Sequence, residues 1–197
     1  PKGSAQLFST RALLLFEENK YSAAIGDYEK AVALGHKNYN SFFNLGFAYA
    51  KTEQLDKSIK AYDKSLETGS EQLSNIYFNK GISYIGLQKY LDAAKSFSLY
   101  INDLPDNSDG YYRRATAYFG HGSDKYDLAL QDVNKAISLD RTKDISFYKL
   151  RAKIRQKMGD TQGAVSDMTS VIDSSSNLTN PYYYLKRSSL FVDLGDY

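Results

Sequence analysis

Small and aromatic residues recur along the chain in a pattern that repeats about every 35 residues. The first small residue of each unit, with an aromatic residue four positions before it, is Ala12, Gly46, Gly81, Ala115, Ala152 or Ser188. The second small residue of each unit is Ala24, Ser58, Ala93, Ala129 or Ala164. Large residues at i, i+3, i+4 and i+7 around these sites predict two packed helices per unit, because small residues let helix backbones approach closely. One such hairpin cannot bury its apolar stripe alone, so neighbouring hairpins must stack.

Two segments carry the pattern best: residues 42–66, FFNLGFAYAKTEQLDKSIKAYDKSL, and residues 111–140, YYRRATAYFGHGSDKYDLALQDVNKAISLD. The pattern resembles the tetratricopeptide repeat family over essentially the whole chain. The resemblance implies an all-α fold, a right-handed solenoid of helical hairpins (an α-α superhelix) with five repeats and one extra helix. We expect one array over residues 1–197, with repeats at about 5–38, 39–72, 74–107, 108–143 and 145–178 and a final helix at 181–194. Arg155 departs from the pattern, because the other first helices carry leucine or an aromatic residue at that site.

The final helix has a clear start signal, and the chain ends in a turn signal. Asn180 can cap the helix, and Pro181 suits its first position. The last three residues, 195–197, match the turn that joins the two helices of earlier repeats. We expect Tyr197 to begin a second helix that the sequence does not contain, and the sequence therefore to be part of a longer array.

Arginine and aspartate occur together in three of the five repeats. An arginine stands immediately before the first small residue at Arg11, Arg114, Arg151 and Arg187. An aspartate stands three positions after the second small residue at Asp27, Asp132 and Asp167, whereas the two repeats without the arginine carry Ala61 and Ser96 there. We predict an ion pair between the two helices of each of these three repeats, since a partly buried arginine needs a partner. The alternative is that these arginines bind anions.

The composition excludes several classes of chemistry. The chain has a formal net charge of +2, two histidines and no cysteine, so thiol catalysis and cysteine-ligated metals are excluded. Neither histidine has a metal partner at helical spacing or a nucleophile motif beside it, and we expect no enzyme, no cofactor and no metal site. No apolar run reaches the ~18 residues of a membrane span. The near-neutral charge argues against nucleic acid as a partner, and we expect a cytoplasmic protein.

Binding is then the expected function. In the family, the first helices line the concave surface, and the inward positions lie three before and one after the first small residue. Together with positions one turn away, they suggest a peptide-binding surface made of Phe43, Asn44, Phe47, Asn75, Phe78, Asn79, Ile82, Tyr112, Phe119, Lys149, Lys153 and Lys157. Aromatic rings would hold apolar side chains, asparagine amides would bond the peptide backbone, and the lysine stripe would meet acidic residues. The alternative is that the aromatics pack against neighbouring helices and the lysines are only solvated.

On the last helix the inward positions are Leu185 and Ser189. One subtype of the family grips a chaperone tail through a carboxylate clamp of lysine, asparagine and arginine. We expect no such clamp, because Ser9 and Leu13 occupy the key sites of the first repeat and cannot supply charged donors. The leading hypothesis is a non-enzymatic scaffold that binds an extended peptide or a partner protein on its concave face. The alternatives are the regulatory or targeting region of a larger enzyme, or a module that self-associates through its exposed terminal helix.

Overall fold

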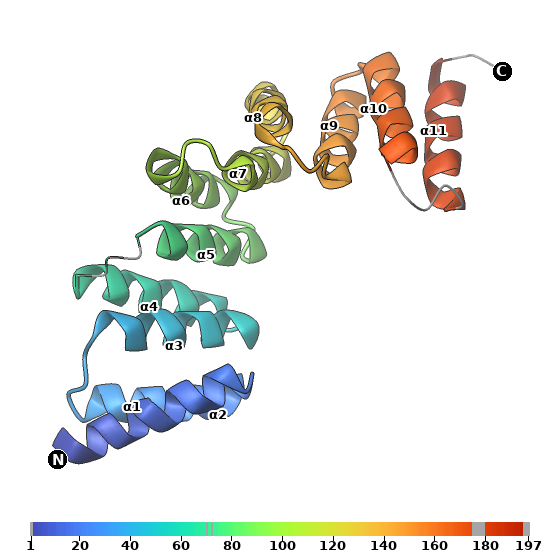
Figure 1. The fold of residues 1–197 in the computed structure, drawn as a ribbon. Helices are drawn as coiled ribbons and strands as arrows, with labels where there is room; N and C mark the ends of the chain where they lie inside the picture. Colours follow the sequence, from blue (N-terminus) through green and yellow to red (C-terminus); the bar gives the residue numbers. More distant parts are fainter. Residues whose placement is uncertain (1, 70, 72, 175–179, 195–197) are drawn as a thin grey trace. The chain divides into compact units, whose positions relative to one another are not determined.

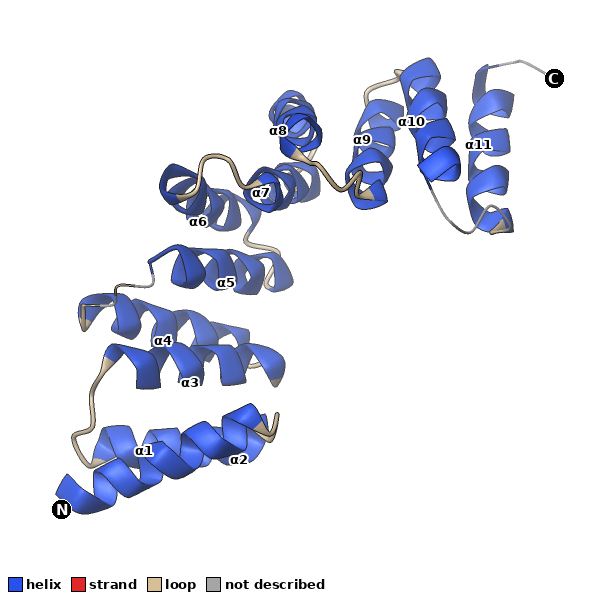
Figure 2. Cartoon of the chain, viewed as in Figure 1, coloured by secondary structure: helices blue, strands red, loops and turns tan. Residues whose placement is uncertain are grey.

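The structure is a computed structural model that describes residues 2–69, 71, 73–174 and 180–194. Within these residues all regular structure is helical, as the blue segments in Figure 2 show. It comprises eleven α-helices and one short 3-10 helix. The chain divides into two compact units, unit 1 (Pro1–Asp103) and unit 2 (Leu104–Tyr197). Figure 1 labels the helices of both units. The all-α hairpin fold expected from the sequence is therefore confirmed.

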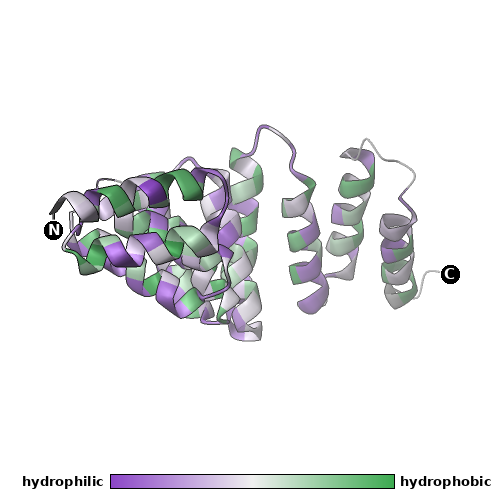
Figure 3. Cartoon of the chain, turned by 90° about the horizontal axis from the view of Figure 1, so that it is seen from below, coloured by the Kyte–Doolittle hydropathy of each residue, from purple (hydrophilic) through white to green (hydrophobic). Residues whose placement is uncertain are grey.

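Unit 1 contains three helical hairpins. Its helices are α1 (Lys2–Glu17), α2 (Tyr21–Ala33), α3 (Tyr39–Lys51), α4 (Leu55–Glu67), α5 (Leu73–Gly86) and α6 (Tyr90–Asp103). Each hairpin packs on the next because α2 contacts α3 and α4 contacts α5, and the first helices α1, α3 and α5 also contact one another in order. Figure 3 shows hydrophobic and hydrophilic residues interleaved along the helices, as expected when one face of each is buried.

Unit 2 contains two hairpins and one further helix. Its helices are α7 (Ser108–His121), the 3-10 helix η1 (Ser123–Lys125), α8 (Tyr126–Leu139), α9 (Ile145–Lys157), α10 (Thr161–Ser174) and α11 (Pro181–Leu194). Helix α8 packs on α9, and α10 packs on α11. The backbone N–H of Tyr182 donates to Asn180 Oδ1 at 3.0 Å, so Asn180 caps α11 as predicted.

Four of the five hairpin turns in the described residues share one conformation. Asn19, Glu53, Gln88 and Gly159 have φ angles of 60°, 61°, 57° and 83°, which place them in the left-handed region. The N–H of the next residue bonds back to a carbonyl five positions earlier, as in Asp160 to Arg155 at 2.9 Å. This arrangement satisfies the carbonyls at the end of the first helix. The turn between α7 and α8 differs, because its extra residues form η1 and Gly122 has a φ of 136°.

The small residues lie where the two helices of a hairpin meet. Ala12, Ala115 and Ala152 are buried. A Cβ atom added to Gly46 would lie 2.8 Å from the Tyr62 ring, which is too close. The close approach predicted from the sequence is therefore real, and at this glycine no side chain fits.

Several expectations remain open. The single array over residues 1–197 stays a prediction. The turn at residues 195–197, including Tyr197, lies outside the described residues. In the part of the chain that the structure describes, no helix has both the length and the apolar character that crossing a membrane requires.

Candidate functional site

A hollow of about 440 Å³ opens in unit 2 between α7, α9, α10 and α11. Half of the described residues that line it are aromatic or basic, and none of these described residues is acidic. We call it the lysine hollow and define it by Tyr112, Phe119, Lys149, Lys153, Tyr183 and Lys186. Three lysines around one cavity, with no carboxylate among the described residues that line it, make it electropositive.

Lys149 is the most firmly placed of the three lysines. Its Nζ donates a hydrogen bond to Tyr183 Oη at 3.3 Å and lies 5.4 Å from the centre of the Tyr183 ring, so the contact joins α9 to α11. Lys153 lies one helical turn further along α9 and is exposed, whereas Lys186 on α11 is half-buried. The lysines thus reach the hollow from two helices.

The aromatic wall of the lysine hollow is braced by neighbouring rings. Tyr112 packs against Phe147 with ring centres 4.9 Å apart, and Phe119 packs against Tyr126 at 5.4 Å. Both wall residues are half-buried, so part of each ring stays available. Rings held in this way lose little conformational entropy when they receive an apolar side chain.

Helix α11 contributes residues to the hollow that the repeat pattern did not predict. Tyr182, Lys186 and Leu190 line the hollow, but the expected inward residues Leu185 and Ser189 do not. The i, i+4, i+8 spacing of the first three was a usable signal, because it places them on one helix face. The expected positions were transferred from the other first helices and are out of register with the lining face of α11.

The structure brings together only some of the predicted binding residues. Tyr112, Phe119, Lys149 and Lys153 share the lysine hollow, whereas Lys157 is exposed on α9 and does not line it. The other predicted residues belong to unit 1 and are described by themselves below.

The three predicted phenylalanines of unit 1 are half-buried and pack on neighbouring rings. Phe43 lies 5.8 Å from Tyr62, and Phe78 lies 5.9 Å from Phe97. Phe47 lies 5.4 Å from Phe16, which belongs to the preceding hairpin. These rings therefore contribute to packing within and between hairpins. Ile82, in contrast, is exposed.

Two of the three predicted asparagines of unit 1 have internal partners for their side-chain amides. Asn44 Nδ2 donates to Tyr28 Oη at 3.0 Å, and Asn79 Nδ2 donates to the carbonyl oxygen of Asn75 at 2.8 Å. The Asn75 side chain is exposed. A shallow hollow of about 270 Å³ beside Asn44 has an uncharged lining, apart from the ring of His36. Unit 1 thus offers neutral polar groups where unit 2 offers lysines.

The three predicted ion pairs are confirmed, each between the two helices of one hairpin. The shortest contacts are Arg11 Nε to Asp27 Oδ2 at 2.5 Å, Arg114 Nε to Asp132 Oδ2 at 2.7 Å and Arg151 Nη2 to Asp167 Oδ1 at 2.6 Å. All three pairs use both Nε and Nη2, and in the first two each nitrogen bonds a different carboxylate oxygen, which is the bidentate geometry that favours arginine over lysine. The hydrogen bond from Arg11 holds the pKa of the Asp27 carboxyl below its ordinary value of 3.8, against the opposing effect of burial.

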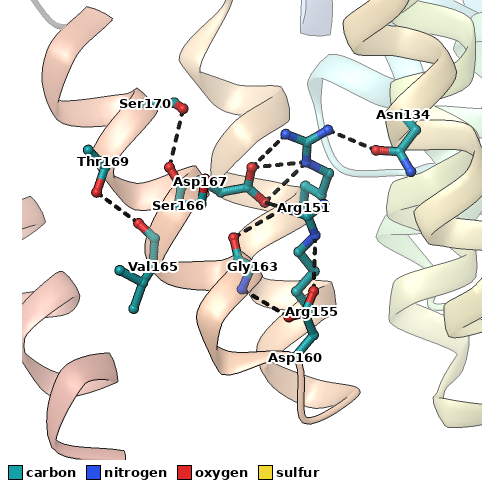
Figure 4. Close-up of polar contacts among 10 residues, drawn as sticks. All are labelled: Asn134, Arg151, Arg155, Asp160, Gly163, Val165, Ser166, Asp167, Thr169 and Ser170. Atoms are coloured by element: carbon teal, nitrogen blue, oxygen red, sulfur yellow. Dashed lines mark hydrogen bonds and ion pairs between the residues drawn. The ribbon is translucent and has the colours of Figure 1, made fainter. Parts of the chain in front are cut away.

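Arg155, the departure noted in the sequence, is explained by the same network. Its Nη1 donates to Asp167 Oδ2 at 2.9 Å and to the Gly163 carbonyl at 3.1 Å. Figure 4 shows Asp167 facing both Arg151 and Arg155, with Asn134 of α8 on the other side of Arg151. Asp167 is buried, so the two guanidinium groups compensate a carboxylate that is removed from water.

The histidines lie apart from these networks. His36 Nε2 lies 2.7 Å from Asn38 Nδ2, and His121 Nδ1 lies 3.1 Å from Asp124 Oδ1. Among the described residues, no group of three or more histidine, cysteine, aspartate or glutamate side chains could hold a metal ion.

Comparison with known proteins gives matches at the level of family and fold. Residues 12–53 match the family described as TPR repeat, and residues 39–68 match the family described as tetratricopeptide repeat. A TPR repeat-containing protein of Methanocaldococcus jannaschii is 27% identical over 179 residues, which cover 87% of this chain and 31% of that protein. The chain spans less than a third of the length of each curated relative it matches.

Two solved structures share the fold at low sequence identity. MamA residues 41 to the end from Desulfovibrio magneticus RS-1 is 16% identical with a TM-score of 0.80, covering 90% of this chain and 98% of that one. YrrB, described as a TPR protein with an unusual peptide-binding site, is 15% identical with a TM-score of 0.77, covering 92% and 90%. Residues 12–68 thus match tetratricopeptide repeat families, and the helical hairpins have the fold of these solved structures.

Proposed function

We propose that the chain is a non-enzymatic protein-interaction module that binds an acidic segment of a partner protein in the lysine hollow of unit 2. The observation that carries this proposal is the meeting of three lysines and several aromatic rings around one open cavity, with no acidic residue among the described residues that line it. The aromatics Tyr112 and Phe119 would receive an apolar side chain of the partner. Lys149, Lys153 and Lys186 would receive its carboxylates through charge-assisted hydrogen bonds.

Binding fits the hollow better than catalysis does. The described residues that line it supply hydroxyl groups and ammonium groups, but neither a carboxylate nor an imidazole that could serve as a general base. The fold is shared with YrrB, whose description as a TPR protein with a peptide-binding site is consistent with a binding role for this architecture. Within unit 1, the phenylalanines, Asn44 and Asn79 would form a contact surface of their own, with weaker affinity because their rings and amides already have internal partners.

The direct test is fluorescence anisotropy with a labelled short peptide of alternating glutamate and phenylalanine. Lys149→Glu combined with Lys153→Glu should weaken binding at least tenfold, or about 1.4 kcal/mol, because attraction becomes repulsion at the hollow. Lys157→Glu is the matched control, since it changes the same charge on the same helix outside the hollow. Equal loss in both variants, or equal binding of a peptide with glutamine in place of glutamate, would reject the proposal.

A second candidate function is self-association through α11. Its exposed Tyr182, Leu185 and Val192 form apolar surface on the last described helix, and such surface often marks an interface. Light scattering over a range of concentrations distinguishes this candidate, which requires the mass to rise with concentration. If the chain is the targeting region of a larger enzyme, the lysine hollow would be the surface through which it selects its partner.

A further inference from the structure

The hollow of about 270 Å³ beside Asn44 differs in chemistry from the lysine hollow. Helices α1, α2 and α3 of unit 1 and the turn between α2 and α3 line it. Apart from Leu13, the described residues that line it are polar, and apart from the His36 ring none of them is acidic or basic. We call it the polar hollow and define it by Ser9, Leu13, Tyr28, Asn40 and Asn44. A charged ligand would lose water there without gaining a counter-charge, so the polar hollow favours a neutral ligand.

Tyr28 and Asn44 present one free donor and one free acceptor to the polar hollow. Tyr28 is 1% exposed, and its hydroxyl oxygen accepts a hydrogen bond from Asn44 Nδ2 at 3.0 Å. That bond leaves the Tyr28 hydroxyl proton and Asn44 Oδ1 unused, and neither has a hydrogen-bond partner among the described residues. Burial raises the pKa of the Tyr28 hydroxyl, so this group keeps its proton at neutral pH and remains a donor.

The next hairpin carries the same two residue types without the same arrangement. Tyr62 and Asn79 stand at the positions of Tyr28 and Asn44 relative to the small residues. Asn79 Nδ2 instead donates to the carbonyl oxygen of Asn75, four positions earlier on its own helix. Tyr62 Oη is buried and has no hydrogen-bond partner among the described residues. The orientation of Asn44 is therefore set by its bond to Tyr28 and does not follow from the helix alone.

A primary amide matches the free groups of the polar hollow. Its carbonyl oxygen and one of its N–H groups lie on the same side, so it can accept from the Tyr28 hydroxyl while it donates to Asn44 Oδ1. A trans peptide group has its N–H and C=O on opposite sides and cannot bond both groups at once. Leu13 is 42% exposed at the same hollow and can cover the methylene groups of a glutamine side chain. These features select a side-chain carboxamide over polypeptide backbone.

We propose that the polar hollow binds the side-chain carboxamide of a glutamine in a partner protein. The Tyr28 hydroxyl donates to the carbonyl oxygen of that glutamine, and Asn44 Oδ1 accepts from its N–H group. The proposal does not depend on the lysine hollow, because the polar hollow lies in unit 1 and takes a neutral group where the lysine hollow takes an acidic one.

The probe is the tripeptide glycine–glutamine–glycine with both ends blocked, titrated into the isotope-labelled full chain and followed by NMR. The proposal expects shifts at Ser9, Asn40 and Asn44, including the side-chain amide of Asn44. Three matched peptides carry alanine, glutamate or glutamine methylated on its side-chain nitrogen in the central position. Each should bind roughly tenfold more weakly, because it lacks the carboxamide or the N–H group that bonds Asn44. Equal binding of the alanine peptide would show that only the backbone is recognised, and equal binding of the methylated peptide would exclude the paired hydrogen bonds. Either result would overturn the proposal.

Two variants of the protein test the named groups. Tyr28→Phe removes the hydroxyl and keeps the ring, and it should weaken the glutamine peptide roughly three- to tenfold. Tyr62→Phe is the matched control, because it removes the corresponding enclosed hydroxyl of the next hairpin and should leave the affinity unchanged. Asn44→Ala should weaken binding similarly, whereas Asn79→Ala should not.

Circular dichroism establishes that the four variants keep their helix content. Unchanged affinity in Tyr28→Phe and Asn44→Ala, or equal losses in these variants and their controls, would contradict the assignment. So would the absence of shifts in the polar hollow at about 10 mM glutamine peptide, a concentration that largely saturates a site with a Kd of about 1 mM.

Discussion

The hairpins of unit 1 and unit 2 place different pairs of residues where their two helices meet. In unit 1, Gly46 and Gly81 face the rings of Tyr62 and Phe97. In unit 2, the same sites carry Ala115 and Ala152, and the facing residues are Val133 and Met168. Where one helix of the hairpin carries an aromatic ring, the facing residue on the other helix is glycine. Where it carries an aliphatic side chain, the facing residue is alanine. The first hairpin is the exception, since Ala12 packs in one cluster with Tyr28.

The two units also differ in where they place charge. Unit 1 has neutral polar groups beside Asn44, and its Arg11–Asp27 pair has an arginine open to solvent. Unit 2 has the lysine hollow and a buried aspartate held by two arginines. The repeat therefore fixes the hairpin, whereas the residues that it leaves variable differ between the two units in charge and in ion pairing.

The largest expected effect comes from breaking the buried network of unit 2. Asp167→Ala leaves Arg151 and Arg155 without their shared carboxylate, and it should lower the free energy of unfolding by about 3–5 kcal/mol. Asp27→Ala in unit 1 should cost much less, because Arg11 can turn to water. Urea unfolding followed by circular dichroism measures both. Equal losses would contradict the distinction drawn between the two units.

A smaller effect is expected at the glycine sites. Gly81→Ala places a Cβ atom 2.7 Å from the Phe97 ring and should destabilise the protein by about 1–3 kcal/mol. Combining it with Phe97→Leu should restore part of the loss, because the smaller side chain leaves room for the methyl group. A double variant whose cost equals the sum of the single costs would reject the size compensation.

The smallest effect concerns pH and the Asp27 carboxyl. Its pKa in the folded protein lies below 3.8 because of the hydrogen bond from Arg11. The ionised Asp27 carboxyl therefore stabilises the fold above about pH 4. This stabilisation is lost as the pH falls through the pKa that the group has in the folded protein. Asp27→Asn should lower the Tm by a few degrees at pH 7, and the difference from the unmodified protein should shrink toward pH 3. A Tm difference that grows on acidification would contradict the prediction that the ionised Asp27 carboxyl stops stabilising the protein at low pH.

Much of the fold could be predicted from the sequence because its signals are local and repeated. The small residues, the Asn180 cap and the arginine–aspartate pairs each depend on spacing within one hairpin, and each was found where expected. The binding residues were harder to predict, since they depend on contacts between hairpins. Asn44 donates a hydrogen bond to Tyr28 of the preceding hairpin, and Lys149 donates one to Tyr183 of α11. The spacing of residues within a single repeat does not predict such contacts between hairpins.

The central claim is that unit 2, through its lysine hollow, is the place where an acidic partner segment binds. The most direct measurement is an NMR titration of the isotope-labelled chain with the alternating glutamate–phenylalanine peptide. The account predicts shifts around Tyr112, Lys149, Lys153 and Tyr183 that weaken as salt is added, because the attraction is largely electrostatic. Shifts centred on Asn44 and Phe43 of unit 1, or no change at saturating peptide, would contradict it.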